Sequence, residues 1–186
     1  MKVIPYCINK RDDWDSFVRS SKNGTFLLQR GFMDYHADRF FDCSVMVYAG
    51  ITSADGYQEE DFDLRRLVAL FPANWVESEA CVYSHQGLTY GGLIVKPEVT
   101  QTEVLSIMRA VLLYYQSYLQ ARRIVVKPIP YIYSDIPSAE ELYALFRAGA
   151  VLKRRQVSTV VSMAHPMKMR TLRLRQAKKA IEHGFY

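Results

Sequence analysis

Short apolar runs separated by polar, turn-forming residues alternate along this chain with longer segments of helical periodicity. Six runs have the length and pattern of β-strands: residues 3–8, 42–48, 67–73, 80–95, 124–133 and 156–162. The fifth run contains Pro128 and Pro130, which cannot donate ladder hydrogen bonds. We therefore expect regular strand pairing to fail partway along it.

Five further segments place apolar residues at helical spacing: residues 12–22, 31–40, 100–123, 138–149 and 167–181. Two of them begin with an S/T-x-x-E capping box, formed by Thr100 with Glu103 and by Ser138 with Glu141. Gly149 stands where a helix commonly ends in the left-handed conformation. These signals define the two helices that flank the fifth predicted strand.

The order of these elements predicts the fold class. A strand and two helices are followed by three largely antiparallel strands, and then by helix, strand, helix and strand. A meander followed by strand–helix–strand crossovers predicts an α/β (α+β) fold with a mixed, mostly antiparallel sheet flanked by helices. We expect one domain over residues 1–165 and a basic helix over residues 166–186, in an interdomain or oligomer contact.

The charge of the chain is unevenly distributed. The 186 residues are 49% apolar, enough for a substantial core, and carry a net charge of +5. Residues 151–186 hold nine Lys or Arg residues against Glu182 alone, so this tail carries +8 and residues 1–150 carry −3. Three interpretations of the tail are open: it binds tRNA or another polyanion, it lies on an anionic membrane surface, or it is an interdomain helix. The interdomain helix is the favoured interpretation.

The cysteines and the apolar runs bear on the compartment. Cys7, Cys43 and Cys81 are far apart, are odd in number and lack metal-ligand spacing, so we expect buried reduced thiols in a cytoplasmic protein and no metal. The acidic segment at residues 50–64 is expected to be a solvated hairpin tip. No run approaches the roughly 20 apolar residues of a membrane span, so no membrane span is predicted.

The most distinctive stretch is SHQGLTYGG at residues 84–92, which interrupts the fourth predicted strand. Glycine is unfavourable inside a strand because it loses more backbone entropy than other residues and offers no side chain to pack. Three glycines here predict a bulge or a place where another group approaches the backbone closely. The alternative is a glycine-rich connection with a hydrogen-bonded histidine.

Four stretches resemble a known family: NGTFLLQRGFMDYHADRF (23–40), ALFPAN (69–74), SHQGLTYGGLIV (84–95) and KPIPYIY (127–133). They are similar to the N-terminal domain of the bacterial Fem-like acyltransferases, which consist of two domains of the GNAT fold. The resemblance implies transfer of an acyl or aminoacyl group to an amine, often for cell-envelope precursors. It also implies a possible acyl-CoA donor and either a second GNAT-like domain or a homodimeric partner.

Two departures from this family pattern favour an alternative. The Q/R-x-x-G-x-G/A turn that holds the pyrophosphate of acyl-CoA in GNAT domains is not found, since the turn before the long helix reads KPEVTQTE. The chain also stops where the second Fem-like domain is expected to begin. The competing expectation is a non-catalytic GNAT-like half that acts as a binding or scaffolding domain.

Acyl transfer to an amine requires a base, an oxyanion donor and an acid for the leaving group. His85 is the candidate base, because its unperturbed pKa lies near the working pH. Tyr90 is the candidate acid, and the amides around Gly87, Gly91 and Gly92 are candidate oxyanion donors. The alternatives are a structural, hydrogen-bonded His85 and a Tyr90 that packs in the core.

The remaining candidates for substrate or cofactor binding lie in this stretch and in two other segments: Ser84, Gln86, Lys127, Tyr131, Tyr35, His36 and Arg39. Lys127 stands near a strand end, where ligands of open sheets gather, and either holds a phosphate or carboxylate or extends to solvent. The cluster at residues 34–39 either lines an acceptor pocket or ties its helix to the sheet by internal pairing.

Overall fold

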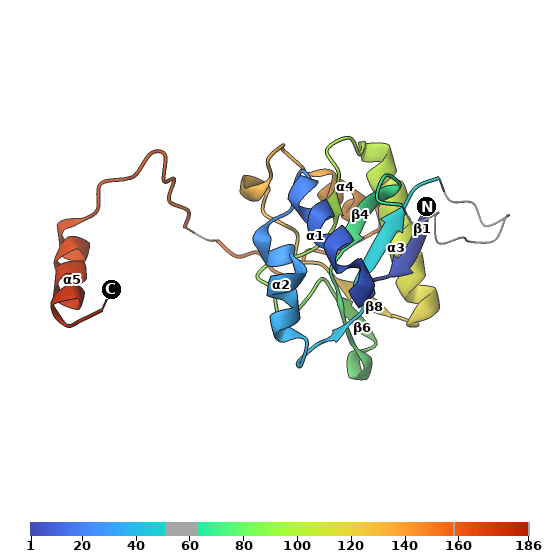
Figure 1. Cartoon of the computed structure of the whole chain (residues 1–186), viewed down its shortest axis with the longest axis horizontal. Helices are drawn as coiled ribbons and strands as arrows, with labels where there is room; N and C mark the ends of the chain where they lie inside the picture. The colour runs from blue at the N-terminus through green and yellow to red at the C-terminus, as the bar shows by residue number, and fades with distance from the viewer. Residues whose placement is uncertain (51–62, 158, 186) are drawn as a thin grey trace. The chain divides into compact units, whose positions relative to one another are not determined.

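A computed structural model of the chain describes residues 1–50, 63–157 and 159–185, without the side chain of His36. The acidic segment expected as a hairpin tip at residues 50–64 therefore lies largely outside the described residues. The chain divides into two compact units, Met1–Val151 and Leu152–Tyr186 (Figure 1). All strands of the described residues belong to the first unit.

The described part of the first unit forms two four-stranded sheets. The first sheet is antiparallel throughout, in the order β1 (Lys2–Pro5), β3 (Val45–Tyr48), β4 (Leu67–Phe71) and β7 (Ile94–Val95). The second sheet has the order β2 (Phe41–Asp42), β5 (Asn74–Val76), β6 (Cys81–Tyr83) and β8 (Arg123–Val125). Its last pair, β6 and β8, is parallel, because the chain crosses over through a helix between them.

The first unit also contains the helices α1 (Arg11–Ser20), α2 (Arg30–Met33), α3 (Gln101–Tyr118) and α4 (Glu140–Arg147). The second unit contains α5 (Thr171–Glu182), so a helix forms in the expected basic segment. The expected fold class is confirmed: an α+β fold with mostly antiparallel sheets flanked by helices. No helix within the described ranges is both long enough and apolar enough to cross a bilayer.

The chain passes between the two sheets from β2 to β3, from β4 to β5 and from β6 to β7. The strand predicted at residues 42–48 is divided at the first crossing, and β5 is a strand that the sequence pattern does not predict. The strand predicted at residues 80–95 is divided at the stretch that is expected to interrupt it. At the first two crossings Ala73 donates its N–H to Ser44 Oγ at 3.0 Å, and Cys43 donates its N–H to the Ala73 carbonyl at 3.0 Å. Pro72 cannot continue the ladder, so β4 ends just before it.

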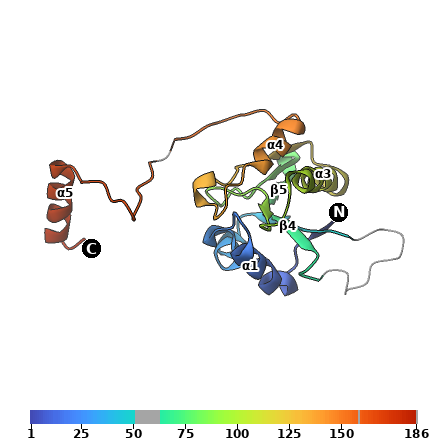
Figure 2. The ribbon, with the colours of Figure 1, turned by 90° about the horizontal axis from the view of Figure 1, so that it is seen from above.

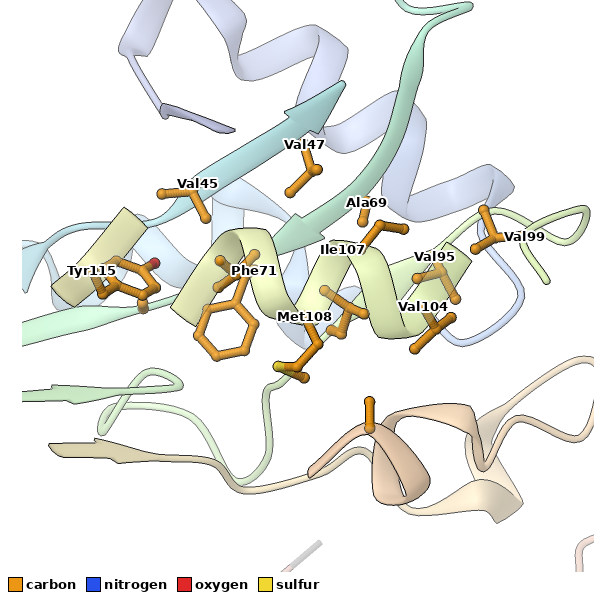
Figure 3. Packing of buried hydrophobic residues seen from close by; sticks show 14 of the residues in the cluster. Val45, Val47, Ala69, Phe71, Val95, Val99, Val104, Ile107, Met108 and Tyr115 are labelled. Atoms are coloured by element: carbon orange, nitrogen blue, oxygen red, sulfur yellow. The ribbon is translucent and has the colours of Figure 1, made fainter. Parts of the chain in front are cut away.

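Helices cover both faces of the first sheet. In β3, Val45 and Val47 pack on the side of α3, whereas Met46 and Tyr48 pack on the side of α1. Figure 2 shows α1 on one side of β4 and α3 on the other, and Figure 3 shows the α3 side of this core in detail. Strand β3 is therefore buried on both faces, which explains why its residues are almost all apolar.

One of the two predicted capping boxes forms. Glu103 donates its N–H to Thr100 Oγ1, and Glu103 Oε2 accepts the Thr100 N–H at 2.8 Å, at the start of α3. The second predicted box is wrong, because α4 has Ala139 as its N-cap and no side-chain cap. Ser138 instead donates its hydroxyl to Glu140, and Glu141 accepts the N–H of Leu93, the residue before β7.

The last two predicted strands have different outcomes. β8 ends at Val125, an isolated bridge joins Gly91 to Pro128, and Tyr131–Tyr133 forms the 3-10 turn η7, so the expected failure of pairing at the prolines is confirmed. The strand predicted at residues 156–162 is wrong for the described residues of that segment, which form no strand. Gly149, at φ +76°, confirms the left-handed residue expected after α4.

Candidate functional site

The stretch SHQGLTYGG lies where the parallel ladder between β6 and β8 is interrupted. The Ser84 N–H donates to the Val125 carbonyl at 2.9 Å, and Ser84 Oγ accepts the Lys127 N–H at 2.8 Å. The ladder then omits residues 85–90 and resumes at Gly91, whose N–H donates to the Lys127 carbonyl at 2.8 Å. Residues 85–90 thus form a loop that leaves the strand and returns to it.

The two glycines at the end of this loop confirm the expected close approach to the backbone. A Cβ on Gly91 would lie against the Ser84 carbonyl, so the entry and the exit of the loop are in direct contact. Gly92 has a φ of +91°, and a Cβ there would lie 2.5 Å from Glu141 Oε1. Both approaching groups belong to this chain.

Replacing Gly91 with alanine is expected to lower the free energy of unfolding by about 2 kcal/mol, because the added methyl group meets backbone atoms that cannot rotate away. Urea denaturation of the purified variant measures this loss. Gly31→Ala is the matched control, since its nearest neighbour is the flexible end of the Arg11 side chain at 3.8 Å. Equal stability of the two variants would contradict the close contact at Gly91.

His85 occupies the first position of the loop in an uncommon backbone conformation. Its φ of 64° lies in the left-handed region, and its N–H donates to the Tyr83 carbonyl at 2.7 Å. The residue is only 4% exposed, and its ring meets Phe40 edge to face at a centroid distance of 5.6 Å. Non-glycine residues in this region are uncommon and often mark functional or strained positions.

Tyr90 closes the loop at the opposite end. It is buried, its hydroxyl donates to Thr25 Oγ1 at 3.1 Å, and its ring stacks on Tyr133 at a centroid distance of 5.4 Å. Most of the Tyr90 side chain therefore packs in the core, which was one of the two roles expected for this residue. The hydroxyl is held beside Thr25, which precedes the 3-10 turn η2 (Phe26–Leu28).

Gln86 and Lys127 bind the loop to the sheet. Gln86 donates its N–H to Asn74 Oδ1 at 2.7 Å, and its side-chain Oε1 accepts from Asn74 Nδ2 at 2.9 Å. Lys127 Nζ donates to the carbonyls of Gln86 and Leu88, rather than extending to solvent. Partial burial lowers the pKa of this ammonium group.

The other expected site residues lie at the surface. Tyr131 on η7 and Tyr35 on η3 (Asp34–His36) are largely exposed. Arg39 is exposed as well and pairs with Asp38 at 3.8 Å. The side chain of His36 lies outside the described residues. Hydrogen bonds thus join Ser84, Gln86, Gly91 and Lys127 into one network, whereas Tyr35, Arg39 and Tyr131 are surface positions.

Glu141 is the functional candidate that sequence reasoning missed. Its Oε1 accepts the Leu93 N–H at 2.7 Å, and the absent side chain of Gly92 makes room for its carboxyl group. Burial raises the pKa of Glu141 to about 8, and the Leu93 hydrogen bond only partly opposes this shift. The sequence presents this residue as a member of a capping box, and no local signal pairs position 141 with position 93.

Two neighbouring polar side chains hold the same region in place. Asn23 donates from Nδ2 to the Leu93 carbonyl at 2.8 Å and accepts the Val95 N–H at 3.0 Å, so its amide substitutes for a paired strand along β7. Lys22, which is buried, forms a 2.6 Å ion pair with Glu140 of α4. Leu93, and with it the position of Glu141, is therefore fixed from both sides.

A surface cavity of about 490 Å³ lies elsewhere, between α3 and α4. Its lining is mainly apolar, with two arginines: Leu105, Ser106, Met108, Arg109, Leu112, Leu113, Gln116, Ala144, Arg147 and Ala148. None of the site residues expected from the sequence contributes to this lining. The cavity is thus separate from the loop at residues 85–90.

Comparison of the chain with protein-family models, with curated proteins and with solved structures found no match in any of the three. Among the residues that the structure describes, no three His, Cys, Asp or Glu side chains gather as metal ligands.

Proposed function

We propose that this chain is an acyltransferase domain that transfers an acyl or aminoacyl group to an amine. The strand order supports the proposal, because a meander followed by the parallel crossover from β6 through α3 to β8 is the order expected of a GNAT-type domain. The opened ladder at residues 85–90 lies within that parallel pair, at the stretch that resembles the Fem-like family.

The observation that carries the proposal is the placement of the Glu141 carboxyl group, which lies against Gly92 at the exit of the loop, accepts the Leu93 N–H, and has its pKa raised by burial. An amine is mostly protonated near neutral pH and must lose a proton before it attacks a carbonyl carbon. A general base works best when its pKa lies near the operating pH, and an ordinary carboxylate is too weak for this. A carboxyl group with a pKa of about 8, oriented by the Leu93 N–H, meets that requirement.

Three side chains of this site take part in the proposed reaction. Glu141 accepts a proton from the substrate ammonium group, the amine nitrogen forms a bond to the acyl carbon, and the bond from that carbon to the donor breaks. Tyr90 donates its proton to the leaving group, which for an acyl-CoA donor departs as the thiol, and the second proton of the attacking nitrogen passes to the Tyr90 oxygen as the neutral amide forms. His85 is a second candidate for the base. It follows Ser84, which contacts Gly91 at the exit of the loop.

The cytoplasm is the compartment we propose. The cysteines are free thiols, as expected, and Cys81 is buried. Cys7 differs from the expectation, because it is exposed at the surface rather than buried. An exposed free thiol persists most readily in a reducing compartment, which supports this location.

Replacing Glu141 with glutamine is expected to lower kcat/KM for amine acylation by at least about 100-fold, because the amide cannot accept the proton. The assay measures thiol release from acetyl-CoA and longer acyl-CoAs with a panel of primary amines. For the unsubstituted chain we expect kcat/KM to rise with pH up to about 8, where the carboxyl group ionises.

Glu98→Gln is the control, since it removes an exposed carboxylate. His85→Gln tests the second base, and a loss of turnover with an unchanged melting temperature assigns it a chemical role. Unchanged turnover in Glu141→Gln would refute Glu141 as the base. Absence of both thiol release and a thermal shift with any acyl-CoA would refute an acyl-CoA donor.

A non-catalytic domain that packs on a partner is the second candidate, and one observation favours it. Helix α4 buries Ala144, whereas Leu142 and Phe146 are exposed, Phe146 by 72%. The adjacent turn η7 also presents apolar side chains to solvent. A second GNAT-like domain or a second copy of this chain would cover such a surface, and sedimentation of the purified chain tests the second copy.

A further inference from the structure

The second unit, Leu152–Tyr186, concentrates the positive charge of the chain. Glu182 is its only acidic residue, and its basic residues are Lys153, Arg154, Arg155, Lys168, Arg170, Arg173, Arg175, Lys178 and Lys179. A net charge of +8 on this short segment attracts anionic partners strongly at low salt. The charge alone does not distinguish a nucleic acid from a membrane surface.

Helix α5 carries an apolar stripe next to basic side chains. Leu174, Ala177 and Ile181 lie on one face through spacings of three and four residues, and Leu174 and Ile181 are 52% and 58% exposed. Arg175 and Lys179 are four residues apart on the other side of the helix, whereas Lys178, four residues after Leu174, borders the apolar stripe. No residue of α5 is buried by the other described residues of its own unit, so that unit does not cover the apolar stripe.

We propose that α5 binds the surface of an anionic lipid bilayer and lies in the plane of the interface. A helix of 12 residues spans about 18 Å, well short of the roughly 30 Å core of a bilayer, so it lies along the interface rather than crossing it. The apolar face enters the acyl boundary, and the basic face contacts anionic headgroups.

The apolar side chains favour lipid over nucleic acid. A polyanion such as RNA neutralises the basic residues through its phosphates but leaves Leu174 and Ile181 in water. Exposed apolar side chains also lie before and after the helix, at Met169 and Phe185. No aromatic residue is interleaved with the basic residues of α5, so a stacking surface for single-stranded bases is lacking in this helix. A bilayer surface satisfies both the charge and the apolar face.

Vesicle co-sedimentation of the full chain tests the proposal. We expect binding to phosphatidylcholine vesicles that contain phosphatidylglycerol, weak binding to phosphatidylcholine alone, and loss of binding as salt increases. Leu174→Gln/Ile181→Gln, which keeps every charge and uses a good helix former, is expected to weaken binding at least about tenfold. Arg175→Gln/Lys178→Gln/Lys179→Gln is expected to do the same.

Lys153→Gln/Arg154→Gln/Arg155→Gln is the matched control, because it removes the same charge outside α5. It is expected to change the affinity by less than about threefold. Circular dichroism checks that each variant keeps its helix content. Equal vesicle binding by Leu174→Gln/Ile181→Gln and the unsubstituted chain would overturn the proposal, since charge alone would then account for binding.

Two further results would also overturn it. In the first, the chain does not bind vesicles but binds a short polyuridylate RNA tightly, and Leu174→Gln/Ile181→Gln binds that RNA equally well. The second is a dimer in sedimentation that this double variant dissociates, because α5 would then pair with a second copy. Neither result depends on acyl transfer, so the inference and the proposed function are tested separately.

Discussion

Arg30→Ala is expected to lower the free energy of unfolding by about 3 to 5 kcal/mol. The Arg30 side chain is 1% exposed, and its guanidinium carbon lies 3.4 Å from the ring centre of Tyr6 and 4.1 Å from that of Trp14. Nη1 also pairs with Asp42. Truncation removes these contacts, leaves a cavity against α1, and deprives a carboxylate of its partner.

Urea denaturation measures the effect, and two further variants define its cause. Arg30→Met keeps most of the side-chain volume and is expected to lose less stability than Arg30→Ala, because Asp42 is exposed enough to be solvated. Arg19→Ala removes an exposed arginine of α1 and is expected to change stability by less than about 0.5 kcal/mol. A similarly small loss in Arg30→Ala would show that the two rings do not depend on the guanidinium group.

Glu141→Gln is expected to stabilise the fold above neutral pH while it removes the proposed base. The pKa of Glu141 is about 8 in the folded chain, against an ordinary value of 4.5. Because the pKa of Glu141 is higher in the folded chain, the folded chain is favoured while this carboxyl group is protonated. This contribution to the free energy of unfolding is fully present below about pH 4.5 and is lost as the pH rises through about 8. Glutamine stays neutral, and it keeps an acceptor for the Leu93 N–H.

The advantage of the variant is therefore expected to grow from about pH 4.5 to pH 8, towards an upper limit of about 5 kcal/mol. Urea denaturation of both proteins at acidic, neutral and alkaline pH measures this difference. Glu98→Gln, with an exposed carboxylate, is expected to follow the unsubstituted chain at every pH. Parallel stability curves for Glu141→Gln and the unsubstituted chain would refute a buried, neutral carboxyl group at this position.

Local sequence signals locate most of the elements before residue 150 but not their partition between two sheets, and the strand that they predict at residues 156–162 does not form in the described residues. The Thr100–Glu103 box marks the start of α3 correctly, because both halves of that interaction lie within four residues. The division of the long strands between two sheets depends on contacts such as that of Ser44 with Ala73, which are far apart in sequence. A periodic apolar pattern is identical on either side of such a crossing, so it does not reveal the change of sheet.

The candidate site shows the same limit. The close approach at Gly91 and Gly92 follows from their position inside a strand, but the groups that approach them do not. The carboxyl group of Glu141 and the side chain of Arg30 are buried, whereas charged residues are normally expected at the surface. Their burial results from pairing with segments that no local pattern connects to them.

The direct contact of Ser84 with Gly91 has a consequence for the evolvability of this chain. Hydrogen bonds of Ser84 with Val125 and Lys127, and of Gly91 with Lys127, close the two ends of the loop. Insertions between the closed ends cost little loop-closure entropy, because that cost grows slowly with length. His85, Leu88 and Tyr90 are buried, so we expect such insertions at the exposed Thr89, where the loop can lengthen while the ladder that carries it stays unchanged.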